Sequence, residues 1–434
     1  MATGTLKAAL AASALGLGLA ASLGAPMAHA EAPAVKHSSA VEDLRAGLAG
    51  MIAQGSLPNA QVIIARDGKD VVRFHMGVLD RESGKPLPDN AIFRLYSMTK
   101  PITTVAAMML VEEGRISLDA PISRYLPEFA HMRVYESGDL ENMVTVPAAR
   151  QITVRDLMTH SSGLTYNFTG NTPVQQYYRK HGVMRGGGVG RRPEDAPPAA
   201  TMDKLIQRLA AAPLLHQPGE RFSYSNSTGV LGVLVERASG MPLDSFFKER
   251  IFGPLEMRDA TFVVSDAQLP RFVANYNAST DGMSLAETAE QSEYRDPARM
   301  FDGGGALAGT AEDYLHFAQM LANRGEWHGH RLLKPESVDT MFTPLFETGG
   351  QAHENVMFGL GLGIGDAASE AIGGMPAGAG GWSGSANTYF FADPRRNLVA
   401  LLMTNELISG EFTERTVKIR TLLDKAAVEV GSGK

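Results

Sequence analysis

The feature that most constrains the fold is the position of the strand-like segments, which stand near both ends of the chain. Residues 60–65 and 71–74 are apolar runs separated by a Gly-containing turn, a pattern typical of a hairpin. Residues 388–392 and 398–403 repeat this pattern near the other end. Strands at both ends with helices between them imply one sheet assembled from both termini. The sequence therefore predicts an α/β (α+β) fold, with an antiparallel sheet flanked by helices and an inserted, mainly helical domain.

Between the two hairpins the apolar residues recur with helical spacing. The clearest buried face runs over residues 102–110, and Gly114 ends that helix. Further helices are predicted at residues 155–158, 202–209, 229–238, 243–251, 311–323 and 413–428. We therefore place the sheet domain at residues 31–135 and 300–434, and the mainly helical domain at residues 136–299.

One long segment, residues 165–200, has no clear periodicity. Gly and Pro clusters interrupt it, so we expect an irregular lid or entrance loop there. Four aromatic residues flank or enter this segment: Tyr166, Phe168, Tyr177 and Tyr178. Two interpretations stay open for them, because they would either line a substrate pocket or pack the segment itself.

The first thirty residues read as a secretory signal peptide. They hold an apolar Ala/Leu/Gly run of about 16 residues, shorter than the ~20 that span a bilayer. Ala28-His29-Ala30 is a small-x-small cleavage pattern. We expect removal of residues 1–30, export to the periplasm or outside, and no stable membrane insertion after processing.

Composition excludes several classes of function. The 434 residues include no Cys, which removes disulfides, thiolate metal sites and cysteine nucleophiles. The net charge of −7 argues against nucleic acid as a partner. The Gly-rich run at residues 186–190 lacks the Lys-Ser/Thr of a phosphate loop. We expect no metal and no cofactor.

Ser97-Met98-Thr99-Lys100 places a serine and a lysine three residues apart at the start of the first strong helix. At this spacing the two side chains share a helix face, so the Lys100 amine can reach the Ser97 hydroxyl. A serine needs a neighbouring base to act as a nucleophile, and a lysine is a base only when its pKa is lowered. The motif is common by chance: Ser245 and Lys248 repeat it without any companion motif.

Tyr224-Ser225-Asn226 is the only Tyr-x-Asn in the chain. In an extended segment the first and third residues point to the same side. Tyr224 would then relay a proton to or from Ser97, while Asn226 holds Lys100 or the substrate carbonyl. The alternative is a turn with a packed tyrosine.

A Gly-rich segment, Gly381-Trp382-Ser383-Gly384-Ser385, precedes the C-terminal hairpin. Small residues there allow a substrate to lie along the strand edge. The backbone N–H of Ser385 would be a second oxyanion donor beside that of Ser97.

These three motifs in this order resemble the serine β-lactamase/penicillin-binding superfamily, on the class C β-lactamase side, and most closely the family VIII carboxylesterases. Further similar stretches lie at residues 157–164, 218–226 and 254–257, and the likeness covers residues 60–403. The resemblance implies a β-lactamase-like fold, Ser97 as nucleophile, and Lys100 and Tyr224 as its catalytic partners. It also implies a structural role for His160.

The sequence departs from the family's β-lactamases and peptidases at one motif. Those enzymes carry Lys-Thr-Gly where this chain has Trp382-Ser383-Gly384, and neither Lys-Thr-Gly nor Lys-Ser-Gly occurs in it. An indole in place of an ammonium removes a site for a substrate carboxylate and adds an apolar wall, which suits a neutral ester. The change also removes a positive neighbour of Tyr224, which favours Lys100 over a Tyr224 phenolate as the base, but the choice between the two stays open.

The predicted function is hydrolysis of a small-molecule neutral ester through an acyl-enzyme on Ser97. Three alternatives stay open: a β-lactamase or D-amino-acid peptidase (D-Ala-D-Ala carboxypeptidase), an acyltransferase, and a non-catalytic sensor on a penicillin-binding fold.

Overall fold

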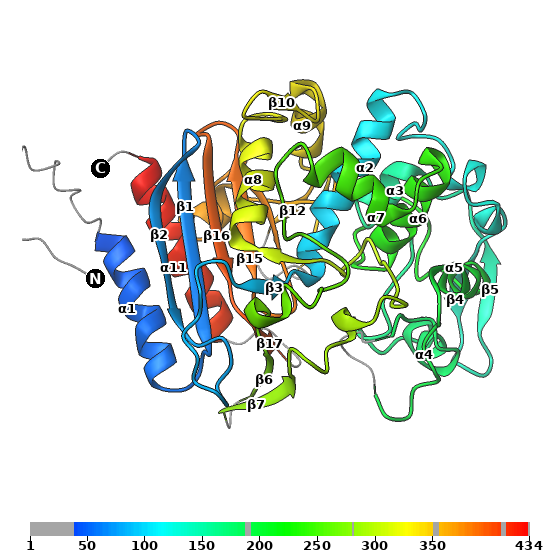
Figure 1. The fold of residues 1–434 in the computed structure, drawn as a ribbon. Coiled ribbons are helices and arrows are strands. Elements are labelled where there is room, and N and C mark those ends of the chain that lie inside the picture. Colours follow the sequence, from blue (N-terminus) through cyan, green and yellow to red (C-terminus); the bar gives the residue numbers. More distant parts are fainter. Residues whose placement is uncertain (1–38, 187–191, 280–281, 350–355, 409–413, 433–434) are drawn as a thin grey trace, which may run out of the picture. The chain divides into compact units, whose positions relative to one another are not determined.

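The computed structural model describes residues 39–186, 192–279, 282–349, 356–408 and 414–432 (Figure 1). Residues Ser38–Lys434 form one compact unit. The division into a sheet domain and a helical domain stays a prediction. The expected signal peptide, residues 1–30, and most of the Gly-rich run lie outside the described residues. Within the described ranges, no helix is long and apolar enough to cross a membrane.

An eight-stranded antiparallel sheet joins the two ends of the chain, as predicted. Strand β1 lies between β2 and β16, so the N-terminal and C-terminal hairpins share a ladder in which Ile63 pairs with Leu401. The order across the sheet is β11 (Phe346–Glu347), β12 (Met357–Phe358), β13 (Gly363–Ile364), β14 (Gly380–Ser383), β15 (Tyr389–Asp393), β16 (Leu398–Met403), β1 (Asn59–Arg66), β2 (Lys69–Gly77).

Helices cover both faces of the sheet, which explains why β1 is buried at nearly every position and apolar from Val62 to Ala65. Helices α1 (Ser39–Ala53) and α11 (Glu414–Gly431) pack with Val62 and Ile64 of β1 in one buried cluster. Ile63 points to the opposite face and joins the main core with α8 (Ala311–Ala322). Alternate strand residues face opposite sides of a sheet, so a strand covered on both sides reads as a continuous apolar run.

Most of the predicted helices are present. Helix α2 (Thr99–Glu112) is buried along most of its length and packs against α6 (Ser227–Ser239). The other predicted helices are α3 (Val154–Met158), α5 (Met202–Ala211) and α7 (Leu243–Phe247). The predicted helix at 243–251 changes after Phe247 into a π-helical turn, η4 (Lys248–Phe252).

Several short elements were not predicted. The helices among them are α9 (Pro335–Met341) and α10 (Ala367–Ala371), and the 3₁₀ turns are η1 (Tyr96–Met98), η2 (Ile122–Arg124), η3 (Pro127–Phe129), η5 (Leu269–Arg271) and η6 (Glu293–Arg295). The strands are β3 (Ile92–Arg94), β4 (Arg133–Ser137), β5 (Val144–Pro147), β6 (Asn275–Ser279), β7 (Gly282–Glu287), β8 (Ala308–Thr310), β9 (Glu326–Trp327), β10 (His330–Arg331) and β17 (Glu406–Ile408). Most have fewer than six residues, too few for a periodic pattern to appear.

The segment at residues 165–200 is not irregular throughout, contrary to our expectation. It contains helix α4 (Pro173–Lys180), which begins with a capping box between Thr172 and Gln175. Arg179 on this helix donates to the carbonyl of Asn167 at 2.6 Å and so ties the helix to the preceding loop. The Thr-Pro-x-Gln signal was present, but the Gly and Pro clusters after it obscured it.

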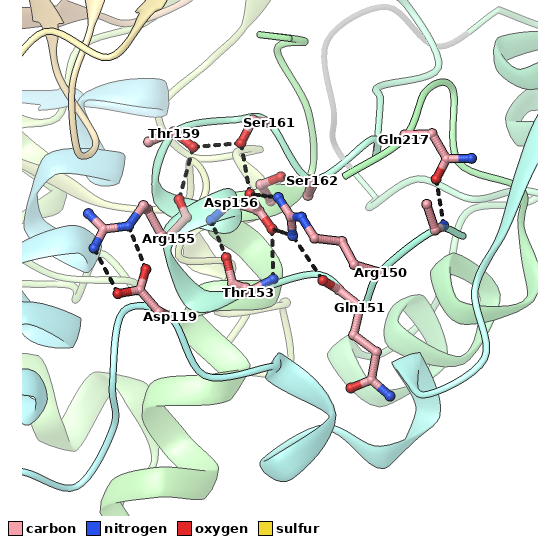
Figure 2. A network of polar contacts seen from close by, with 12 residues as sticks. Asp119, Arg150, Gln151, Thr153, Arg155, Asp156, Thr159, Ser161, Ser162 and Gln217 are labelled. Atoms are coloured by element: carbon pink, nitrogen blue, oxygen red, sulfur yellow. Dashed lines mark hydrogen bonds and ion pairs between the residues drawn. The ribbon is translucent and has the colours of Figure 1, made fainter. Parts of the chain in front are cut away.

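A polar network fixes the start of α3, the short helix that leads into Thr159-His160-Ser161 (Figure 2). Asp156 is buried and accepts two hydrogen bonds from the Arg150 guanidinium, at 2.6 and 2.9 Å. Its carboxylate also accepts from the backbone N–H of Thr153 and from the Ser161 hydroxyl. One carboxylate thereby joins both ends of α3.

Replacing Asp156 with alanine is expected to destabilise the protein by about 2–3 kcal/mol, because the helix cap and several hydrogen bonds are lost together. The measurement is urea unfolding at constant m-value. Asp119, drawn in the same figure, is the matched control: it pairs with Arg155 but its side chain is 75% exposed. Asp119→Ala should cost about 0–1 kcal/mol. Equal losses for the two variants would contradict this account of α3.

Candidate active site

Ser97 lies in the 3₁₀ turn η1, directly before α2. The turn is entered through Tyr96, whose φ of 44° is in the left-handed region that a tyrosine rarely adopts. Such backbone strain is concentrated at functional sites. The Ser97 side chain is partly exposed, while Tyr96 and Met98 beside it are buried. The fold therefore presents one hydroxyl to solvent from an otherwise buried turn.

Lys100 is fully buried and its amine contacts Ser97, as the three-residue spacing predicts. Its Nζ donates to Ser97 Oγ at 3.1 Å and to the Gly304 carbonyl at 2.6 Å. The amine also lies 4.7 Å from the centre of the Tyr224 ring and 5.5 Å from that of Tyr166. These contacts all suit a positive charge.

Tyr224 reaches the same serine from the segment just before α6. Its hydroxyl donates to Ser97 Oγ at 2.7 Å. The Trp382 Nε1–H, on strand β14, donates to the Tyr224 hydroxyl at 3.4 Å. Trp382 itself lies against Gly363 of the neighbouring strand, where a side chain would press on the indole ring. The structure thus brings together Ser97, Lys100, Tyr224 and Trp382.

An aromatic cluster holds the Tyr224 ring in place. The rings of His160, Tyr166 and Trp382 have their centres 4.9, 5.3 and 5.5 Å from that of Tyr224. Burial lowers the pKa of His160 well below its usual value, so the ring is neutral. His160 Nδ1 contacts Ser225 Oγ at 3.1 Å. The contact with Ser225 is compatible with the structural, hydrogen-bonding role that the resemblance implied for His160, which stays a prediction.

The pKa of Lys100 shifts in the direction opposite to the one that a neutral base requires. Burial alone would lower its pKa, but the Tyr166 and Tyr224 phenols and the Asp302 carboxylate outweigh burial and raise it. This direction favours the protonated amine and does not support Lys100 as the neutral base; the assignment of the base stays a prediction. The sequence argument counted the cation lost at Trp382 but not the groups that surround Lys100.

Asn226 contacts a backbone carbonyl and not Lys100, one of its two predicted partners, while its predicted contact with the substrate carbonyl stays a prediction. Its side-chain amide donates to the Thr165 carbonyl at 2.8 Å and is buried. It joins the start of α6 to the loop that carries Tyr166, and does not bond Lys100. The motif spacing was sufficient to find Asn226 but could not show which backbone group lies opposite it.

The turn after β14 lies beside the segment that carries Ser97. A side chain at Gly384 would come within 2.4 Å of the Leu95 carbonyl, so only glycine allows this approach. Ser385 follows in the same turn and is partly exposed. This position is compatible with the predicted oxyanion role of the Ser385 N–H.

The four aromatic residues of the 165–200 segment separate into two groups. Tyr166 lies in the site, and Phe168, 42% exposed, stacks on it with ring centres 4.8 Å apart. Tyr178 is fully buried in the core, and Tyr177 stacks on His181. Tyr177 and Tyr178 therefore pack within the protein, and a pocket-lining role for Tyr166 and Phe168 stays a prediction.

Sequence reasoning missed the loop at residues 302–305. Gly304 supplies the carbonyl that accepts from Lys100, and Asp302 accepts from the Gly304 N–H at 2.8 Å. Three consecutive glycines before a predicted helix were the available signal. A glycine run is found in many turns, so the pattern alone does not indicate a site.

A sheet built from both termini, with Ser-x-x-Lys at a helix start and a tyrosine on the serine, matches the serine β-lactamase/penicillin-binding protein fold. The chain belongs to the Beta-lactamase family, whose profile matches residues 38–423.

Several known proteins are similar to this chain, and two of them are described as an esterase and as a hydrolase. Protein Rv1367c of Mycobacterium tuberculosis is 34% identical, over 80% of this chain and 86% of that protein. Esterase EstB of Burkholderia gladioli is 32% identical, over 84% of this chain and 90% of its own length. The solved structure of EstCE1, described as a hydrolase with promiscuous acyltransferase activity, superposes with a TM-score of 0.72 at 25% identity, covering 89% of this chain and 98% of EstCE1. The family and these relatives support an enzyme of the hydrolase or acyltransferase kind.

Proposed function

We propose that this protein hydrolyses neutral carboxylic esters through an acyl-enzyme on Ser97. The observation that carries the proposal is the convergence of Lys100 and Tyr224 on one partly exposed serine oxygen, at 3.1 and 2.7 Å. A nucleophile and its proton acceptor need this hydrogen-bond distance to react.

In the proposed reaction the Tyr224 hydroxyl first gives its proton to solvent, and the Lys100 ammonium stabilises the phenolate that remains. Ser97 Oγ then attacks the ester carbonyl carbon, and its proton passes to the Tyr224 oxygen. Lys100 keeps its charge and stabilises the negative charge on both oxygens. When the tetrahedral intermediate collapses, Tyr224 returns the proton to the leaving alkoxide, which departs as alcohol. A water molecule then attacks the Ser97 ester, giving its proton to Tyr224, and the acid leaves as Ser97 regains its proton.

The backbone N–H groups of Ser97 and Ser385 are proposed to bind the oxyanion. Such donors point at the negative charge that develops on the carbonyl oxygen. In comparable sites the loss of one donor raises the activation free energy by about 3–4 kcal/mol. The close approach of Gly384 to the Leu95 carbonyl supports this placement, because it holds the Ser385 turn against the segment of Ser97.

The presence of Trp382 in the site is the argument that the substrate is uncharged. It occupies the strand position of the Lys-Thr-Gly lysine and places an indole over Tyr224, with Phe358 at its edge, ring centres 5.1 Å apart. An apolar wall offers no counter-ion to a carboxylate, so an anionic β-lactam or peptide would be desolvated without compensation.

The test compares p-nitrophenyl butyrate, nitrocefin and a D-Ala-D-Ala peptide with the purified protein. We expect kcat/KM for the ester to exceed that for either anionic substrate by at least about 100-fold, since an uncompensated charge costs several kcal/mol. Faster nitrocefin turnover would instead favour a β-lactamase.

Acyl transfer is the second candidate, because similarity to EstCE1 joins the two activities. The proposed acyl-enzyme is the same, and only the acceptor differs. Adding a primary alcohol to the ester assay and measuring the new ester against free acid separates the two. New ester as the main product at low alcohol concentration would identify a transferase.

A further inference from the structure

Asp302 is a buried carboxylate that the proposed reaction does not use, although it lies one loop away from Lys100. It is 5% exposed and its Oδ1 accepts from the Gly304 N–H at 2.8 Å. The Gly304 carbonyl in turn accepts from Lys100 Nζ at 2.6 Å. Gly304 therefore links the two charged groups: its N–H binds the Asp302 carboxylate and its carbonyl binds the Lys100 amine.

The position of this carboxylate is closely confined. A side chain at Gly229 of α6 would meet Asp302 Oδ1 at 2.6 Å, and one at Gly303 would meet the Thr103 side chain of α2 at 3.0 Å. Only glycine at these positions lets the loop enter between α2 and α6. Asp302 is thus held between the helix of the nucleophile and the helix that follows Tyr224.

Arg185 contacts the same carboxylate from the 165–200 segment. Its Nε lies 3.3 Å from Asp302 Oδ2, its side chain is 15% exposed, and a second carboxylate, Glu293, is 3.8 Å away. An ion pair at this distance in a shielded site is screened little by solvent. Asp302 consequently faces one cation directly and a second, Lys100, across the Gly304 turn.

We propose that Asp302 is a positioning residue, which holds the Gly304 carbonyl toward Lys100 and keeps the Lys100 amine charged on Ser97, while Arg185 limits this effect. The proposal rests on the proposed function. Other titratable and charged groups also face Lys100, Asp302 or Arg185 from the packed elements: Tyr96, His160, Tyr166, Tyr224, Glu293, Tyr294 and Arg299.

Removing the charge of Asp302 and removing the charge of Arg185 should have opposite effects on the pH at which Lys100 loses its proton, and this makes the proposal testable. Asp302→Asn removes a negative charge but keeps an oxygen that accepts from the Gly304 N–H. Lys100 then loses its proton at lower pH, so the alkaline limb of kcat is expected to move down by about 1–2 pH units. Arg185→Gln removes a positive charge, so its alkaline limb should stay or move up. KM should change little in both variants.

The experiment measures the pH dependence, from pH 6 to 12, of ester turnover and of Ser97 labelling by a fluorophosphonate probe. Asp266→Asn is the control, because Asp266 pairs with Arg295 but its side chain is 95% exposed. Thermal unfolding identifies any variant that has lost its fold. If Asp302→Asn does not fold, Asp302→Glu serves as the second variant. It keeps the negative charge, so the alkaline limb of its kcat profile should lie at the wild-type pH.

Each outcome decides a different claim. A downward shift with Asp302→Asn and none with Arg185→Gln supports the proposal. Equal shifts in both, or a loss of activity at all pH values without a shift, would show a merely structural ion pair and overturn it. Probe labelling that shifts as expected without ester turnover would contradict the proposed ester substrate while supporting Asp302. A wild-type Ser97 that no probe labels would overturn both.

Discussion

Replacing Ser97 with alanine is expected to lower ester turnover by at least about 10³–10⁴-fold, the largest effect of any single change in this protein. The variant lacks the oxygen that forms the acyl-enzyme, while Lys100 and Tyr224 stay in place around a small cavity. Turnover of p-nitrophenyl butyrate and mass spectrometry of the probe-labelled protein measure the loss. We expect an unchanged unfolding midpoint within a few degrees, since Ser97 is partly exposed.

Ser245 provides a matched control for this experiment. It stands in the second Ser-x-x-Lys of the chain, with Lys248 three residues later, but lies on α7 between the core residues Leu243 and Phe246. Ser245→Ala should keep full activity and full probe labelling. Label found on Ser245, or on any residue other than Ser97, would refute the assignment of the nucleophile.

Replacing Tyr224 with phenylalanine is expected to lower kcat by about 10²–10⁴-fold with little change in KM, the range for loss of a general acid–base group. The ring contacts with His160, Tyr166 and Trp382 remain, because only the hydroxyl is removed. Stopped-flow measurement of the nitrophenol burst separates acylation from deacylation, and we expect both to slow because Tyr224 transfers a proton in each.

Tyr166→Phe is the control for the Tyr224 variant. Tyr166 also places its ring near Lys100, at 5.5 Å, but Ser97 Oγ accepts its hydrogen bonds from Lys100 and Tyr224. Burial raises the pKa of Tyr166 to about 12, so its phenol stays protonated at neutral pH. We expect less than a tenfold loss. A larger loss of kcat for Tyr166→Phe than for Tyr224→Phe would show that Tyr166, and not Tyr224, transfers the proton.

Much of the fold could be predicted because its signals are local. The β1 and β16 runs are apolar at consecutive positions, as required of strands covered on both faces, and the α2 stripe has helical spacing. Helix α4 was missed although Thr172 and Gln175 carry a capping signature. A cap identifies where a helix begins, but eight residues give too few turns for a periodic stripe.

The site was predicted in part. Helical geometry brings Lys100 to Ser97, and the ordered motifs indicated Tyr224. The partner of Asn226 was not predictable, because the Thr165 carbonyl is 61 positions away in the sequence. The role of Arg185 was also invisible: its partner Asp302 lies more than a hundred residues further along the chain.

The sequence by itself determined the sheet from both termini, the serine–lysine pair on one helix turn, and the tyrosine motif, since each depends on neighbours a few residues apart. Only the tertiary structure decided the environment that shifts the pKa of Lys100. That shift is a balance between burial, which disfavours an ammonium, and phenols, a carbonyl and a carboxylate that favour it. These groups come from segments up to about 200 residues apart, and packing alone places them around one nitrogen atom.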